Sequence, residues 1–174
     1  MRKKRKALKK FSLRESEKQF LIKFFLIFFA LFLLIHAFDL APFTSDVSTS
    51  LKTAIASLEQ KLLHFAGFQV FRNAEVLYAG VDAYQVVIEC TGLVLVALLA
   101  ALLYSTDLKE KERRRALLLY TPFLLVFNIA RLFVTLYSGV AFGRQTLEIV
   151  HPVLWIVDSL VVLALWAFSA KIRV

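Results

Sequence analysis

The chain has 174 residues, of which 59% are hydrophobic and 14% aromatic, and its formal net charge is +9. An apolar fraction above about half is rare in soluble domains, so this composition indicates one compact integral membrane bundle. The single cysteine, Cys90, excludes a disulfide within the chain and a cysteine-based metal cluster.

Four apolar segments are each long enough to cross about 30 Å of hydrocarbon as an α-helix. These predicted spans are residues 20–38, 86–104, 116–137 and 150–170. They predict an all-α integral membrane protein, a four-transmembrane-helix bundle that forms a single membrane domain over residues 20–171. The first span is too long for the apolar region of a typical signal peptide and is followed by a poor cleavage site, so we expect it to stay uncleaved.

Residues 39–85 connect the first two spans and form an outer segment. Apolar residues recur in it at helical spacing and predict an amphipathic helix that lies on the outer membrane surface or roofs the bundle. These residues are Val47, Leu51, Ile55, Leu58 and Leu62. Residues 68–89 then show short alternating runs, broken near Asn73 and Gly80, which predict a small β-hairpin leading into the second span.

The orientation of the spans follows from lysine and arginine in their short flanks. Residues 1–19, the 107–115 loop and the C-terminal residues are rich in these basic side chains, whereas residues 39–85 and 138–149, taken together, hold more acidic than basic ones. By the positive-inside rule, both termini and the 107–115 loop are predicted to be cytoplasmic, and residues 39–85 and the 138–149 loop to face outward. We interpret residues 1–19 as a basic cytoplasmic tail that anchors the topology on anionic lipid, rather than as a nucleic-acid-binding segment.

Several polar residues lie inside the predicted spans, where they are costly. Measured inward from the outer face at 1.5 Å per residue, Cys90 lies about 6 Å deep, Arg131 about 9 Å and Asp158 about 10 Å, and His151 opens the fourth span. A lone cysteine in an apolar helix is usually a small hydrophobic residue, and a mid-span arginine can belong to a structural ion pair. The convergence of three helices at one level indicates a site, with Asp158 as the predicted counter-ion of Arg131.

Cys90, Arg131 and His151 suit nucleophilic catalysis. A cysteine attacks as its thiolate, which burial disfavours and a nearby cation such as Arg131 favours. The thiolate could attack a peptide carbonyl and form a thioester. His151 could protonate the leaving amine and deprotonate the incoming nucleophile, while Arg131 holds the thiolate or the oxyanion.

Neighbouring residues could support this site. Asn128 and Asp158 would orient the catalytic groups. Thr91 and Gly92 follow Cys90, and Gly92 would give a substrate backbone room to approach. No metal and no organic cofactor is expected, since the histidines lack the spacing of metal ligands.

Three short motifs carry a resemblance to a known family. They are "ECTG" at Glu89–Gly92, "NIAR" at Asn128–Arg131 and "HPVLW" beginning at His151. With these motifs on three successive spans, the chain resembles the exosortase/archaeosortase family of membrane transpeptidases, in a short, core-only form.

The resemblance implies a function and a location. Such enzymes recognise secreted proteins by a C-terminal tail made of a short motif, a transmembrane helix and a basic cluster. They cleave near the motif and pass the new C-terminus to an envelope acceptor, such as a lipid or a glycan. Applied to this chain, the resemblance implies that Cys90 is the nucleophile, Arg131 the partner of its thiolate or of the oxyanion, and His151 the acid/base. It also implies a location in the cell membrane of a bacterium or an archaeon, with the active site facing outward.

Two alternatives stay open. The chain could be a non-catalytic membrane protein, such as a small channel, accessory subunit or assembly factor, in which Arg131 and Asp158 form a structural pair and Cys90 only packs. It could also be a cysteine protease that hydrolyses the thioester, which differs from the transpeptidase only in the acceptor.

Overall fold

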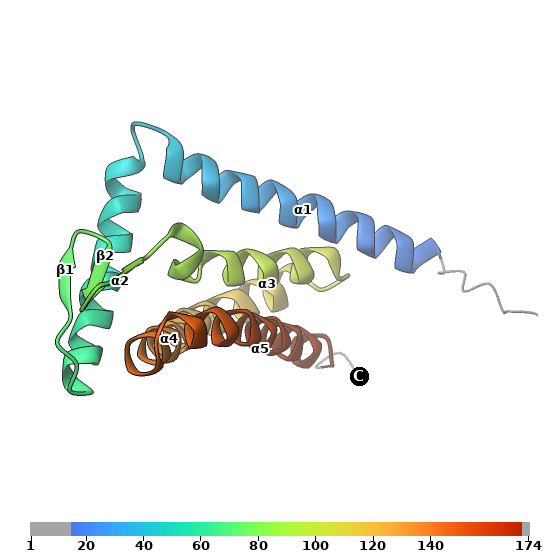
Figure 1. Ribbon diagram of the computed structural model, residues 1–174. Helices are drawn as coiled ribbons and strands as arrows, with labels where there is room; N and C mark the ends of the chain where they lie inside the picture. The colour runs from blue at the N-terminus through green and yellow to red at the C-terminus, as the bar shows by residue number, and fades with distance from the viewer. Residues whose placement is uncertain (1–14, 172–174) are drawn as a thin grey trace, which may run out of the picture.

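The computed structural model describes residues 15–171, which form helices that run side by side, with one helix and a small sheet across one end (Figure 1). Residues 1–14, which hold most of the predicted basic tail, lie outside the described residues. In chain order the elements are α1 (Glu15–Leu40), α2 (Ser45–Phe65), β1 (Phe71–Asn73), β2 (Val76–Ala79), β3 (Asp82–Gln85), the 3-10 turn η1 (Ile88–Thr91), α3 (Leu93–Ser105), α4 (Glu110–Phe142) and α5 (Arg144–Lys171).

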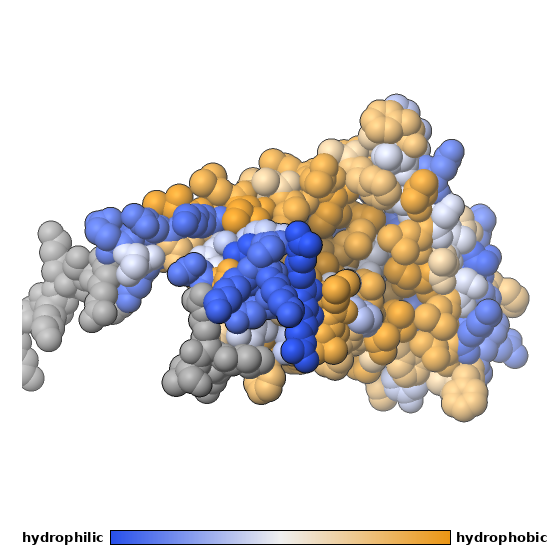
Figure 2. Space-filling view, turned by 180° about the vertical axis from the view of Figure 1, so that it is seen from behind, coloured by the Kyte–Doolittle hydropathy of each residue, from blue (hydrophilic) through white to orange (hydrophobic). Residues whose placement is uncertain are grey.

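The molecule is a multi-pass membrane protein. Within the described residues, α1, α4 and α5 are long and apolar enough to cross a membrane, and α3 is a shorter apolar helix. Helix α3 packs against α1, α4 and α5, and its inward side chains form a buried cluster with Leu124 of α4 and Val162 of α5. Figure 2 shows a broad band of apolar side chains with hydrophilic groups gathered at its two ends, as expected of a protein that faces lipid.

The predicted second span, residues 86–104, is not one helix. Val86 still donates its N–H to the Glu75 carbonyl beside the sheet, and η1 occupies residues 88–91. Gly92 then adopts a left-handed conformation with φ of +83°, so the α-helix starts only at Leu93. The predicted four-helix bundle therefore has three long helices and one of 13 residues among those described.

The predicted outward loop at residues 138–149 is also wrong, because nearly all of it is helical. Helix α4 continues to Phe142 and α5 begins at Arg144, so Gly143, with φ of +88°, is the one residue between them. An Arg144–Glu148 pair one helical turn apart supports the start of α5. Helices do not have to end at the bilayer surface, which is why hydropathy alone placed this boundary too early.

The outer segment contains more structure than one hairpin. Strands β1, β2 and β3 form a three-stranded antiparallel sheet in which β2 is central and Leu77 pairs with Tyr84. Helix α2 crosses the same end of the molecule and packs on the sheet, η1 and α4 (Figure 1). Together α2 and the sheet form a roof over one end of the bundle.

The inward face of α2 differs from the predicted one. Its buried residues are Ser48, Ile55, Ala56, Glu59 and Leu63. Val47 and Leu58, predicted for the apolar face, are exposed. The buried face is rotated because α2 packs against protein on its inner side and leaves other apolar side chains to the exterior.

A second apolar cluster joins the roof to the bundle. It holds Leu63 of α2, Leu77 of β2, Cys90 of η1 and Leu132 of α4, among other residues. Cys90 therefore lies where the roof, the connecting turn and the bundle meet.

Candidate active site

The turn that carries Cys90 has a fixed conformation. The Cys90 N–H donates to the Val87 carbonyl at 2.9 Å, and the Thr91 hydroxyl donates to the Ile88 carbonyl at 2.6 Å. Gly92 ends the turn at positive φ, where a side chain would add strain. Cys90 is thereby held at the start of α3 with only 8% of its surface exposed.

Asn128 joins this turn to α4 through a hydrogen bond. Its Nδ2 donates to the Cys90 carbonyl at 2.6 Å, and the whole residue is buried. A Cβ atom on Gly92 would lie 3.1 Å from the Asn128 Cβ, so the space beside Gly92 is filled by Asn128. Gly92 therefore lets Asn128 come close to the turn, while the approach of a substrate backbone to Gly92 stays a prediction.

Arg131 lies one turn further along α4 and faces α5. Its Nε is 3.5 Å from Asp158 Oδ2, and both side chains are almost fully buried. The predicted ion pair is thus present, but it is long, and among the described residues Arg131 Nε and Asp158 Oδ1 have no hydrogen-bond partner. The Arg131 guanidinium also lies over the Trp155 ring, 5.7 Å from its centroid.

His151 belongs to the first turns of α5 and contacts the same tryptophan. Trp155 Nε1 donates to His151 Nε2 at 2.8 Å. A neutral imidazole that accepts a hydrogen bond at Nε2 carries its proton on Nδ1, so this contact fixes the tautomer of His151. Trp155 ends the "HPVLW" motif and contacts two of the three predicted catalytic residues, a role that sequence reasoning missed although the i, i+4 spacing was visible.

Cys90 and His151 open onto one cavity of about 220 Å³. Its lining residues come from β3, η1, α4 and α5: Asp82, Ala83, Tyr84, Gln85, Cys90, Leu132, Thr135, Leu136, Arg144, Leu147 and His151. Arg131 is not part of this lining but interacts electrostatically with both Cys90 and His151. The structure thus brings Cys90 and His151 to one cavity and places Arg131 close to both.

Tyr84 is a second residue that sequence reasoning missed. Its ring lines the cavity from β3, and among the described residues its buried hydroxyl has no hydrogen-bond partner. Burial, the largest cause, and the nearby Asp82 carboxylate raise the pKa of Tyr84, so the hydroxyl keeps its proton at neutral pH. The alternating pattern of residues 68–89 predicted strands, but it gave no reason to single out the tyrosine.

Glu59 is a third. It lies on the buried face of α2, and neither of its carboxylate oxygens has a hydrogen-bond partner among the described residues. Burial raises its pKa to about 8. The signal that could have revealed it is an acidic residue placed four positions from both Ile55 and Leu63, on what has to be the apolar face.

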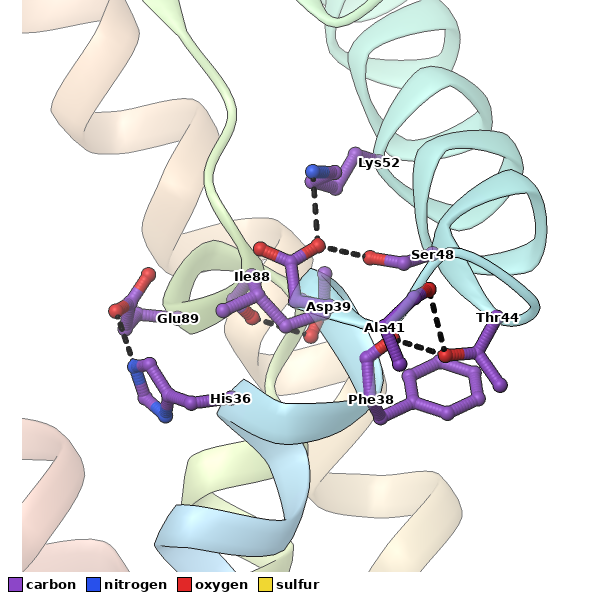
Figure 3. A network of polar contacts seen from close by, with 10 residues as sticks. His36, Phe38, Asp39, Ala41, Thr44, Ser48, Lys52, Ile88 and Glu89 are labelled. Carbon is purple, nitrogen blue, oxygen red and sulfur yellow. Dashed lines mark hydrogen bonds and ion pairs between the residues drawn. The ribbon is translucent and has the colours of Figure 1, made fainter.

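The residue before Cys90 is tied to α1. His36 Nε2 contacts Glu89 Oε1 at 2.9 Å, as Figure 3 shows. Three residues along α1, Asp39 accepts a hydrogen bond from Lys52 at 2.9 Å and another from Ser48, both on α2. The C-terminal end of α1 is therefore joined both to the cysteine turn and to the roof.

Comparison with known proteins gives the family. A family model described as transmembrane exosortase matches residues 21–168. The chain belongs to the transmembrane exosortase family. The match runs from α1 to the last turns of α5 and includes every residue of the candidate site, which confirms the family predicted from the three motifs. Neither a curated protein nor a solved structure matches the chain.

Proposed function

We propose that the chain is a membrane-embedded cysteine transpeptidase. It cleaves C-terminal sorting signals of secreted proteins through a thioester and transfers the new C-terminus to an envelope acceptor. The observation that carries the proposal is the cavity shared by Cys90 and His151, with Arg131 beside it, in a chain of the exosortase family.

In the first half of the reaction, the Cys90 sulfur bonds to the carbonyl carbon of the scissile peptide. Arg131 stabilises the thiolate before the attack or the oxyanion after it. His151 receives the thiol proton and passes it to the leaving amine as the C–N bond breaks. The lone pair that takes this proton is on Nε2, which accepts a hydrogen bond from Trp155 in the resting structure. This hydrogen bond from the indole therefore has to break as the proton arrives.

In the second half, an acceptor attacks the thioester. His151 removes a proton from the acceptor's amine or hydroxyl, the new C–N or C–O bond forms, and the Cys90 thiolate leaves. An acceptor held in the membrane, on a lipid or a glycan, is concentrated near a site at the bilayer surface. Water as the acceptor gives hydrolysis instead, and the chain then acts as a cysteine protease.

The proposed substrates are secreted proteins with a motif, a transmembrane helix and a basic cluster at the C-terminus. On the charge distribution of the sequence, both termini are cytoplasmic and the site faces outward. The basic cluster of such a tail would then stay on the cytoplasmic side while its motif emerges beside the roof.

One observation favours a second candidate function. The buried Arg131–Asp158 pair joins α4 to α5 and could serve only to assemble the bundle. In that case the chain is a non-catalytic membrane protein and Cys90 is a packing residue.

Replacing Cys90 separates the two functions. In cells that secrete a tail-bearing protein, Cys90→Ala is expected to leave the chain inserted in the membrane while the unprocessed protein accumulates. Thr106→Ala, on the distant loop between α3 and α4, is the matched control and should process normally. Normal processing by the Cys90→Ala variant would refute the transpeptidase, and the mass of the product's new C-terminus distinguishes transfer from hydrolysis.

A further inference from the structure

Tyr84 shares the cavity of the candidate site. It lines this cavity together with Cys90 and His151, and it lies six positions before Cys90 in the chain. Strand β3 is paired along its length with β2, and the chain runs directly from β3 into η1. The tyrosine and the cysteine are therefore presented to the cavity by one continuous, hydrogen-bonded segment.

The hydroxyl end of Tyr84 lies close to a glycine on α4. The position that a Cβ atom on Gly139 would occupy lies 2.7 Å from Leu147 Cδ1 and 3.2 Å from both Tyr84 Oη and Tyr84 Cε1. A larger residue at position 139 would crowd both side chains. Gly139 thus lets the hydroxyl end of Tyr84 come close to α4.

The Tyr84 hydroxyl is buried without a hydrogen-bond partner among the described residues. An unpaired buried hydroxyl lowers stability, whereas phenylalanine fills the same space without that cost. Packing alone therefore gives no reason for the oxygen. A protonated, unpaired hydroxyl on a residue that lines the cavity can donate a hydrogen bond to a group that enters there.

We infer that Tyr84 is a further catalytic residue, whose hydroxyl donates a hydrogen bond to the carbonyl oxygen that becomes the oxyanion when Cys90 attacks. This inference rests on the proposed function. No proton is transferred: as the C–S bond forms, the carbonyl π electrons move to the oxygen, and the Tyr84 O–H stabilises the resulting charge together with Arg131. Because the cavity is several times the volume of a water molecule, roughly 30 Å³, it has room for a peptide group.

The test uses a small aldehyde, N-acetyl-alaninal, labelled with ¹³C at the aldehyde carbon. A thiol adds to it reversibly and gives a hemithioacetal, whose oxygen stands where the oxyanion would be. Cys90 is the chain's only cysteine, so a hemithioacetal ¹³C signal from the protein in detergent micelles reports that residue alone. Alkylation of Cys90 by iodoacetamide is measured in parallel, because this substitution forms no oxyanion.

Tyr84→Phe is expected to weaken aldehyde binding by at least about tenfold. It should leave the alkylation rate unchanged, and its unfolding temperature should equal or exceed that of the natural chain. Tyr78→Phe is the matched control, since Tyr78 lies on the neighbouring strand β2, is 40% exposed and does not line the cavity. It should bind the aldehyde as the natural chain does.

Four results would overturn the inference. Equal aldehyde affinity in Tyr84→Phe and the natural chain would show that the Tyr84 hydroxyl donates no hydrogen bond to the oxyanion. Equal losses in aldehyde binding and alkylation show that Tyr84 acts on the thiol instead of the carbonyl oxygen, and a lower unfolding temperature assigns it to packing. If the natural chain itself forms no hemithioacetal, the proposed function fails as well, so the two failures are distinguishable.

Discussion

Glu59 makes the stability of the roof depend on pH. The carboxyl is fully buried on α2, and burial raises its pKa from the ordinary 4.5 to about 8. The folded protein therefore keeps the Glu59 proton to a higher pH than the unfolded chain does. Stability from this group is greatest below about pH 4.5, falls as the pH rises, and levels off above about pH 8.

The size of the effect follows from the two pKa values. At about 1.4 kcal/mol for each pH unit between them, ionising Glu59 in the fold costs about 5 kcal/mol at the limit. Between about pH 5 and pH 9, the free energy of unfolding should fall by about 4 kcal/mol on account of this residue alone. That is a large part of the stability of an ordinary domain.

Thermal unfolding in detergent across this pH range is the assay, with Glu59→Gln as the perturbation. The glutamine cannot ionise, so the variant should lose less stability than the natural chain as the pH rises, and the gap between them should widen up to about pH 8. Glu148→Gln is the control, because Glu148 is exposed on α5, and it should follow the natural chain. Parallel pH profiles for the natural chain and Glu59→Gln would show that Glu59 is ionised at neutral pH and refute the reasoning.

Two further predictions concern contacts inside the site. Trp155→Phe keeps a ring beside Arg131 but removes the hydrogen-bond donor to His151. In ¹⁵N NMR spectra, His151 should carry its proton on Nδ1 in the natural chain and show a mixture of tautomers in the variant. Trp166→Phe is the control, because it removes an indole donor elsewhere on α5, and it should leave the His151 spectrum unchanged. A proton on Nε2 of His151 in the natural chain would contradict the predicted tautomer. Gly92→Ala places a methyl group at positive φ and against Asn128, so it should destabilise the protein by at least about 1–2 kcal/mol, and an unfolding temperature equal to that of the natural chain would contradict the fixed turn.

The sequence predicted the parts of the fold that depend on hydropathy. The long apolar runs near residues 20–38, 116–137 and 150–170 are within helices that can span a membrane. The cost of burying a charge in lipid singled out Arg131 and Asp158, and the structure pairs them. Counting residues from the outer face put Cys90 and His151 at a similar level, and they line one cavity, while their catalytic roles stay predictions.

Features that depend on tertiary packing could not be read from the sequence. The apolar spacing of α2 favoured a face that includes Val47 and Leu58, whereas packing on the sheet and η1 buries the face that carries Glu59. The start of α3 was missed because Gly92 was interpreted as room for a substrate, whereas its positive φ ends a 3-10 turn. Tyr84 was missed because an unpaired hydroxyl can be recognised only once its surroundings are known.

The shortness of α3 has a consequence for how the molecule fills the membrane. Thirteen residues rise about 20 Å, whereas the hydrocarbon core is about 30 Å thick, so α3 alone falls short by about 10 Å. Helices α1, α4 and α5 are long enough to cross, so the deficit is confined to the end of α3 that continues into η1. Ile88, Cys90 and Thr91 of η1 are buried there, so protein and not lipid surrounds the missing length. On the proposed function, a peptide that leaves its own membrane helix beside η1 meets Cys90 before it reaches bulk water.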